Sequence, residues 1–181
     1  CNLFQANKMN KVILPVLLVG IAWLQEILDQ LIFKGSWNLA MGNTMPWWGL
    51  LTAPFSHSGF AHLISNTLIF IPISWLVLSK SLRDYITVWV LVILLEIPIH
   101  LFYKNAIHGL SGVVYGMIGY LVLIGFLERS LLAFVLSIIC FWLYGNSLIA
   151  LIPTFSPAGV SWIGHFGGFA GGLLAALATS T

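Results

Sequence analysis

Four strongly polar side chains lie inside otherwise apolar stretches of this sequence: His62, Asn66, Ser111 and His165. A polar or ionisable group is costly inside a membrane, so each of the four is a candidate functional residue. A serine can act as a nucleophile and a histidine as its base, while histidine and asparagine side chains can donate hydrogen bonds to a developing oxyanion. This set of residue types indicates acyl-transfer chemistry.

Ser111 lies in a short G-x-S-G motif that begins at Gly109 and ends at Gly112. Glycines beside a nucleophilic serine allow a tight turn and let a substrate backbone approach closely. The motif also stands at an expected junction between a loop and a helix, where free N–H groups could face an oxyanion. On the motif alone, the alternative is a serine that only caps the helix.

His165 opens the pattern H-x-x-G-x-x-x-G, which continues with Gly168 and Gly172. Small residues four apart let two membrane helices pack backbone to backbone. Such an approach is what Ser111 and His165 would need in order to form a hydrogen bond. A stripe that only packs helices would explain the glycines, but not an imidazole one turn before them.

A third pattern, H-x-x-x-x-H-x-x-x-N, comprises His57, His62 and Asn66. His62 and Asn66 are four residues apart and therefore share one face of a helix. Both can donate hydrogen bonds, as an oxyanion hole requires. The alternative of a zinc site lacks an H-E-x-x-H motif, a nearby cysteine and a carboxylate at ligand spacing. We therefore expect no metal and no other cofactor.

Tyr115 and His108 flank the serine motif. Tyr115 follows Ser111 by four residues, so it shares that helix face and could pack beside His165. An interior aromatic near the membrane interface would explain the same spacing equally well. His108, three residues before the serine, is interpreted as a loop residue at the interface.

Glu96 and His100 form a second pair of ionisable residues at helical spacing. In chain order they could supply the acid and base of a triad with Ser111. The simpler interpretation is that the two side chains satisfy one another inside the membrane. Lys104 could suggest a Ser-Lys pair, but its place at a helix end is typical of a snorkelling anchor.

The composition indicates an integral membrane protein. Of the 181 residues, 60% are hydrophobic and only 7% are charged, too few to cover the surface of a soluble domain. The net charge of +2 comes without a basic run, so no nucleic-acid partner is expected. Cys1 and Cys140 offer no disulfide framework or zinc spacing, and the start at Cys1 suggests that the chain begins inside a longer one.

Six apolar stretches predict an all-α bundle of six transmembrane helices, since a span needs about 20 apolar residues. A single domain over residues 1–181 accounts for the whole sequence. The helices are expected near residues 11–28, 62–78, 85–103, 111–127, 131–152 and 160–178. The long connection at 31–60 is rich in tryptophan and is predicted to lie at the membrane interface rather than to span it.

Lysine and arginine positions favour a cytoplasmic N-terminus under the positive-inside rule. That orientation puts five of the seven basic residues inside, namely Lys8, Lys11, Lys80, Arg83 and Arg129, and leaves Lys34 and Lys104 outside. The second, fourth and sixth helices then begin at the outer face. All the candidate residues described first would therefore lie in the outer leaflet.

Together, the three patterns resemble the rhomboid family of intramembrane serine proteases. They occur in that family's order and on its second, fourth and sixth helices, so the likeness spans residues 11–178. One departure is in the long first loop, where many members carry Trp-Arg and this sequence has Trp47 followed by Trp48.

The resemblance implies a bacterial-type core in an inner or plasma membrane, with Ser111 as nucleophile and His165 as general base. His62, Asn66 and the Ser111 N–H would hold the oxyanion. Substrates would be transmembrane segments of other membrane proteins, cut near the outer face. One alternative is a rhomboid-like protein without activity that binds transmembrane clients, although such proteins usually lack the serine or the histidine. A small transporter would predict paired charges or broken helices near the bilayer midplane.

Overall fold

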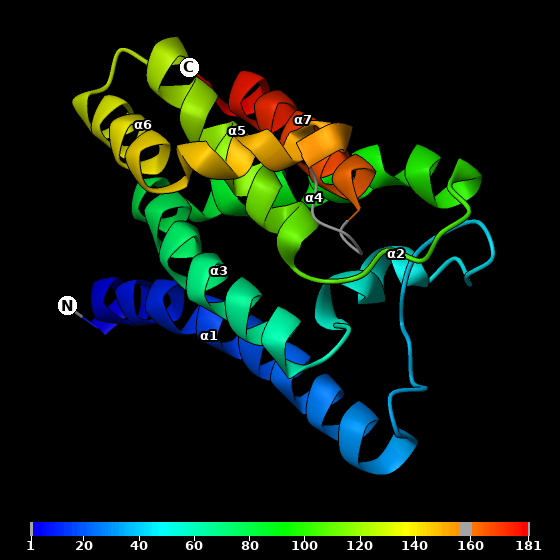
Figure 1. The fold of residues 1–181 in the computed structure, drawn as a ribbon. Helices are drawn as coiled ribbons and strands as arrows, with labels where there is room; N and C mark the ends of the chain where they lie inside the picture. The colour runs from blue at the N-terminus through cyan, green and yellow to red at the C-terminus, as the bar shows by residue number, and fades with distance from the viewer. Residues whose placement is uncertain (1, 156–160, 181) are drawn as a thin grey trace.

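The computed structural model describes residues 2–155 and 161–180, with side chains from residue 11 onward. These residues form a bundle of α-helices without a β-strand (Figure 1). The long helices are α1 (Asn2–Leu28), α3 (Phe60–Lys80), α4 (Leu82–Phe102), α5 (Ser111–Leu127), α6 (Leu131–Tyr144) and α7 (Trp162–Thr179). The short elements are a π-helical turn at Asp29–Phe33, the one-turn helix α2 (Gly49–Thr52) and 3₁₀ turns at Ala53–Phe55, Gly145–Leu151 and Pro153–Phe155.

Some helices begin or end at residues other than the predicted ones, because helix capping and the local backbone set these boundaries. α4 begins at Leu82 because the Ser81 side chain accepts a hydrogen bond from a backbone N–H in the first turn. The segment predicted as one helix at 131–152 is α-helical only to Tyr144, after which a glycine weakens the α-helix and a 3₁₀ turn follows. The predicted start of the last helix, near residue 160, lies outside the described residues.

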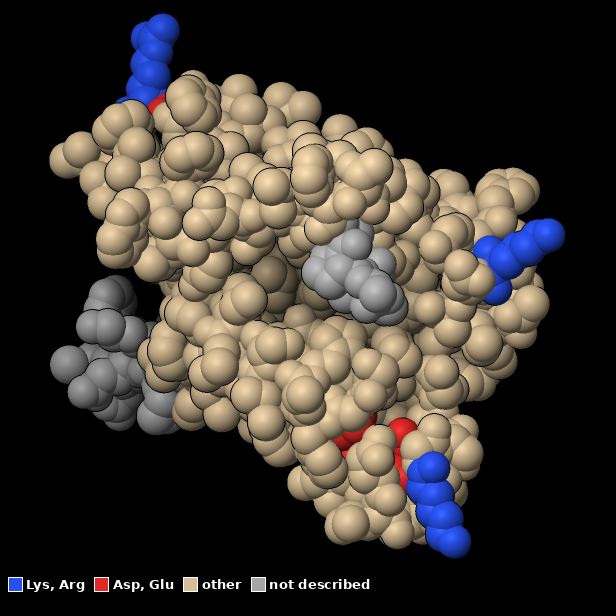
Figure 2. Space-filling view, viewed as in Figure 1, with Lys and Arg blue, Asp and Glu red and all other residues tan. Residues whose placement is uncertain are grey.

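The predicted all-helical membrane bundle is confirmed. The segments long and apolar enough to cross a membrane are Lys11–Phe33, Phe60–Lys80, Leu82–Phe102, Leu131–Leu151 and Trp162–Thr179. On the face in Figure 2, Lys and Arg appear only at the margins of an otherwise almost uncharged surface. The apolar helix α5 has 17 residues, fewer than the about 20 of a full span, which leaves room for a recess at one of its ends.

The glycine stripe of α7 packs directly on α5, in the centre of the bundle (Figure 1). A Cβ on Gly168 would overlap the carbonyl oxygen of Gly112, and one on Gly172 would overlap that of Gly116. The small residues therefore bring two helix backbones into contact, as their spacing predicts. This contact positions the residues at the start of α7 relative to the start of α5.

The long loop between α1 and α3 contains no helix long enough to span a membrane. It is attached instead to the segment that precedes α5. Met41 and Ile107 exchange two backbone hydrogen bonds of 2.9 Å each, and the Gly42 N–H donates to His100 Nδ1 at 3.2 Å. These contacts hold the loop although the Trp47-Trp48 pair replaces Trp-Arg.

The bond from Gly42 corrects our interpretation of His100. His100 accepts a hydrogen bond from the loop, and none joins it to Glu96 among the described residues. Helical spacing places two side chains on one face, but the tertiary neighbours decide which partner each one takes. Glu96 therefore has a different environment from the one expected, described below.

A charged cluster joins the ends of three helices at the end of α5 remote from Ser111. Lys80 Nζ lies 2.6 Å from Asp84 Oδ2 and 2.8 Å from Glu128 Oε1. The Tyr120 hydroxyl donates to the same Asp84 oxygen at 2.6 Å. One cation thus balances two largely buried carboxylates.

Replacing Lys80 by methionine is expected to lower the free energy of unfolding by about 3 kcal/mol, because it leaves Asp84 and Glu128 without their cation. Denaturation of the purified protein in detergent micelles, followed by circular dichroism, measures the change. Lys104→Met is the matched control, since Lys104 is exposed at the end of α4 and forms no ion pair with a described residue. Equal losses in the two variants would contradict the prediction.

Candidate active site

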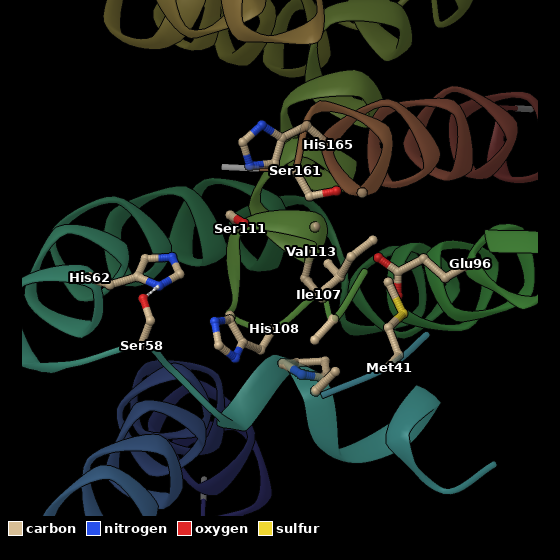
Figure 3. Close-up of a pocket in the computed structure, with 16 residues that line it drawn as sticks. Met41, Ser58, His62, Glu96, Ile107, His108, Ser111, Val113, Ser161 and His165 are labelled. Atoms are coloured by element: carbon tan, nitrogen blue, oxygen red, sulfur yellow. Dashed lines mark hydrogen bonds between the residues drawn. The ribbon is translucent and has the colours of Figure 1, made fainter. Parts of the chain in front are cut away.

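A cavity of about 320 Å³ lies between α3, α4, α5 and α7 (Figure 3). Ser111, His165 and His62 all line it, although they come from three helices. The structure therefore brings together residues that are separated by up to 103 positions in the chain (165 − 62 = 103). Asn66 is buried beside His62 and is not part of the cavity wall.

Ser111 is the first residue inside α5, and the cap position belongs to Leu110, whose side chain makes no capping bond. The alternative of a capping serine is therefore wrong. Just before it, Gly109 has φ +106°, a conformation that side-chain-bearing residues rarely adopt. This turn leaves the Ser111 side chain facing the cavity at a helix N-terminus, where N–H groups lack partners within the helix.

The His165 ring stacks on the Tyr115 ring, with centroids 4.1 Å apart and planes 20° from parallel. The Tyr115 hydroxyl donates to the Ser147 carbonyl oxygen at 2.7 Å, which fixes the position of the Tyr115 ring. His165 is 7% exposed and faces the same cavity as Ser111. No hydrogen bond joins these two side chains, which is common in hydrolases without bound substrate.

Two side-chain nitrogens converge beside the serine motif. A Cβ built on Gly109 would lie 3.1 Å from His62 Nε2 and 3.2 Å from Asn66 Nδ2. His62 Nδ1 lies 3.1 Å from the Ser58 hydroxyl, and when that hydroxyl donates, Nε2 carries the proton. Asn66 Nδ2 is buried and has no hydrogen-bond partner among the residues that the structure describes. With that tautomer, the site holds two donors that converge on Gly109, two residues before Ser111.

Two further histidines surround His62. His57 Nε2 accepts a hydrogen bond of 3.4 Å from the Leu110 N–H, directly before Ser111. Burial, with smaller contributions from the neighbouring His62 and His108, lowers the pKa of His57 to about 3. His108 lines the cavity, and burial also lowers its pKa, with a smaller contribution from His62. Both rings are therefore neutral at neutral pH.

Lowering the pH is expected to destabilise the protein through His57. In the unfolded chain His57 takes up a proton near pH 6.5, but in the folded protein it does so only near pH 3. The free energy of unfolding therefore falls as the pH is lowered from 6.5 toward 3. Thermal unfolding between these limits should show a shallower pH dependence for His57→Gln, whose amide oxygen can still accept from Leu110. Parallel pH profiles for the two proteins would refute this assignment.

The sequence patterns did not identify Ser58 or Ser161 as site residues, and they predicted that Glu96 pairs with His100 rather than lining the cavity. Ser58 bonds to His62, while Ser161 and Glu96 line the cavity. The two serines each precede a candidate histidine by four residues, but Ser58 lies in the loop before α3 and Ser161 is the N-cap residue of α7, so helical periodicity gave no signal for them. Among the described residues, no three His, Cys, Asp or Glu side chains are arranged to hold a metal ion.

Comparison with known proteins identifies the family of the chain. Residues 44–181 match the model of the Rhomboid domain, a region that includes every candidate residue from His57 to Gly172. Uncharacterized proteins of Mycobacterium bovis and Mycobacterium tuberculosis are each 27% identical over 173 residues, covering 87% of this chain and 70% of theirs. One from Mycobacterium leprae is 27% identical over 169 residues, covering 87% and 67%. The chain, a bundle of apolar helices, belongs to the rhomboid family.

Proposed function

We propose that this protein is a serine endopeptidase that cuts transmembrane segments of other membrane proteins by means of Ser111 and His165. One observation carries the proposal: a serine at a helix N-terminus and a histidine from a second helix face one cavity inside an apolar bundle. Contact between the α5 and α7 backbones holds the two residues at fixed positions. Both residues are present, which argues against a client-binding protein without activity.

In this mechanism His165 takes the proton of Ser111 as the serine oxygen attacks a peptide carbonyl. The oxyanion that forms accepts hydrogen bonds from the His62 and Asn66 side chains and the Ser111 N–H. When the tetrahedral intermediate collapses, His165 gives its proton to the leaving amine. A water molecule, activated by the same histidine, then hydrolyses the ester on Ser111.

The other candidate residues position these groups. Tyr115 holds the His165 ring by stacking, and His57 fixes the turn before Ser111 through the Leu110 N–H. Gly109 leaves space beside the two donors, and the contacts of Gly168 with Gly112 and of Gly172 with Gly116 set the distance between α5 and α7. None of these groups takes part in bond breaking.

The location of the site defines the class of substrate. A transmembrane helix hides its peptide carbonyls in hydrogen bonds, so a substrate segment must unwind before a serine can attack it. With the N-terminus in the cytoplasm, Ser111 lies toward the outer face of a bacterial inner or plasma membrane. Cleavage is therefore expected near the outer end of a substrate helix that unwinds readily.

Labelling of the purified protein with a fluorophosphonate, followed by peptide mass mapping, tests the proposal. We expect the label on Ser111, and we expect the protein in lipid vesicles to cleave a co-reconstituted transmembrane peptide near one end. A folded protein that neither labels nor cleaves would instead indicate a rhomboid-like protein that binds transmembrane clients.

Replacing Asn66 by alanine is expected to lower kcat about 100-fold, since it removes one of the donors to the oxyanion. The amide nitrogen donates no hydrogen bond to a described residue in the resting structure, so its loss acts mainly on the transition state. Ser65→Ala is the control, because the exposed Ser65 hydroxyl bonds only to its own helix at the His62 carbonyl oxygen. Kinetics with a transmembrane peptide measure both. An unchanged kcat in Asn66→Ala would remove Asn66 from the oxyanion hole.

A further inference from the structure

The cavity has a polar end that the proposed mechanism does not use. Glu96, on α4, and Ser161, just before α7, both contribute to its wall (Figure 3). In that view Glu96 and His62 lie on opposite sides of Ser111. Glu96 is only 4% exposed, so its carboxyl belongs to the interior of the bundle.

Neither polar group has a hydrogen-bond partner among the described residues. The Glu96 carboxyl forms no hydrogen bond or ion pair with a described residue, and the buried Ser161 hydroxyl has no hydrogen-bond partner in the described part of the chain either. The adjoining wall is apolar and includes Met41, Ile107 and Val113. A buried polar group without a partner destabilises the fold, so these two are costly unless something that enters the cavity binds them.

The Glu96 carboxyl lies next to the reaction centre. A Cβ on Gly112, the residue after the nucleophile, would come within 2.5 Å of Glu96 Oε1. Because Gly112 has no side chain, the Glu96 carboxyl can lie directly against the backbone of the residue after the nucleophile. Ser111 and Glu96 line the same cavity, so a substrate residue adjoining the scissile bond could extend its side chain through that cavity toward the carboxyl.

We propose that Glu96 and Ser161 form a specificity subsite. The subsite binds the side chain of a substrate residue next to the scissile bond, and that side chain donates a hydrogen bond. This inference rests on the proposed protease function. A carboxyl group accepts hydrogen bonds whether or not it is ionised, and the Ser161 hydroxyl accepts as well. An apolar side chain would fill the same space and leave both groups unpaired, so the subsite discriminates against it. The donor is a hydroxyl or an amine.

Cleavage of matched transmembrane peptides tests the subsite and separates the two donors. The peptides carry Ser or Ala, and Lys or Met, at each residue flanking the scissile bond. With the wild-type protein we expect that, at one of the two flanking positions, either the Ser peptide or the Lys peptide is cleaved with a kcat/KM about tenfold or more above that of its Ala or Met counterpart. Glu96→Met should remove that preference. Glu96→Gln keeps an acceptor without a charge, so it should preserve a hydroxyl preference and remove an amine preference.

The preference is the ratio of kcat/KM for the donor peptide to kcat/KM for its apolar counterpart, measured with the same variant. A general loss of activity in that variant therefore cancels. Ser161→Ala should weaken the preference, whereas Ser65→Ala, at an exposed hydroxyl outside the cavity, should leave it intact. Cleavage by the wild type without any donor preference, or a preference that survives in Glu96→Met, would overturn the subsite and leave the protease proposal standing.

A binding measurement judges the subsite even if proteolysis fails. Ser111→Ala protein in lipid nanodiscs is titrated with the same peptides carrying a fluorophore. If one donor peptide binds more tightly than its apolar counterpart, and the difference disappears when Glu96→Met is added, the subsite is supported independently of catalysis. Equal binding of donor and apolar peptides, or no binding of any, would overturn it.

Discussion

Replacing either Ser111 or His165 by alanine is expected to abolish fluorophosphonate labelling and to reduce peptide hydrolysis about 10⁴-fold or more, because a nucleophile and its base act as a unit. For the same reason the double variant should be no worse than either single one. Initial rates of transmembrane-peptide cleavage in lipid vesicles measure the three losses. The rates must be compared at equal amounts of folded protein.

The choice of base can be tested against the other histidines near the site. His108 lines the cavity, whereas His100 does not and accepts a hydrogen bond from the Gly42 N–H. His108→Ala should therefore retain labelling at Ser111. Labelling that persists in His165→Ala and is lost in His108→Ala would assign the base to His108 and refute the proposed pair.

Much of the site could be predicted because its residues follow from helical spacing and membrane topology. Three patterns on alternate helices must come to the same membrane face, and the glycine stripe after His165 must pack closely on a neighbour. The structure places Ser111 and His165 on one cavity, with Tyr115 stacked on His165. Each of these relations depends on local sequence periodicity and on the order of the helices.

Other features could not be predicted, because they depend on contacts between segments distant in sequence. The convergence of His62 and Asn66 on Gly109 requires the exact path of a loop. Glu96 points into the cavity rather than to His100, since a hydrogen bond from the first loop occupies His100. Periodicity identifies the face of a helix but not which neighbour covers it.

The second large effect is expected from Gly172→Ala, which should reduce cleavage about 100-fold and lower the free energy of unfolding by about 2 kcal/mol. A Cβ on Gly172 would overlap the Gly116 carbonyl oxygen and lie 2.8 Å from the Tyr120 backbone nitrogen. Backbone atoms of a packed helix cannot move aside as a side chain can, so α7 must shift away from α5. The shift would carry His165 away from Ser111.

Two other glycines calibrate this prediction. Gly20→Ala should change neither activity nor stability appreciably, because a Cβ on Gly20, in α1, meets no atom within 4 Å. Gly112→Ala should destabilise the fold less than Gly172→Ala, since its nearest neighbour is the end of the flexible Glu96 side chain. Cleavage rates and free energies of unfolding of the three variants, measured in one detergent, test this order of effects. If Gly172→Ala had the same cleavage rate and the same free energy of unfolding as Gly20→Ala, backbone contact between α5 and α7 would not be what positions His165.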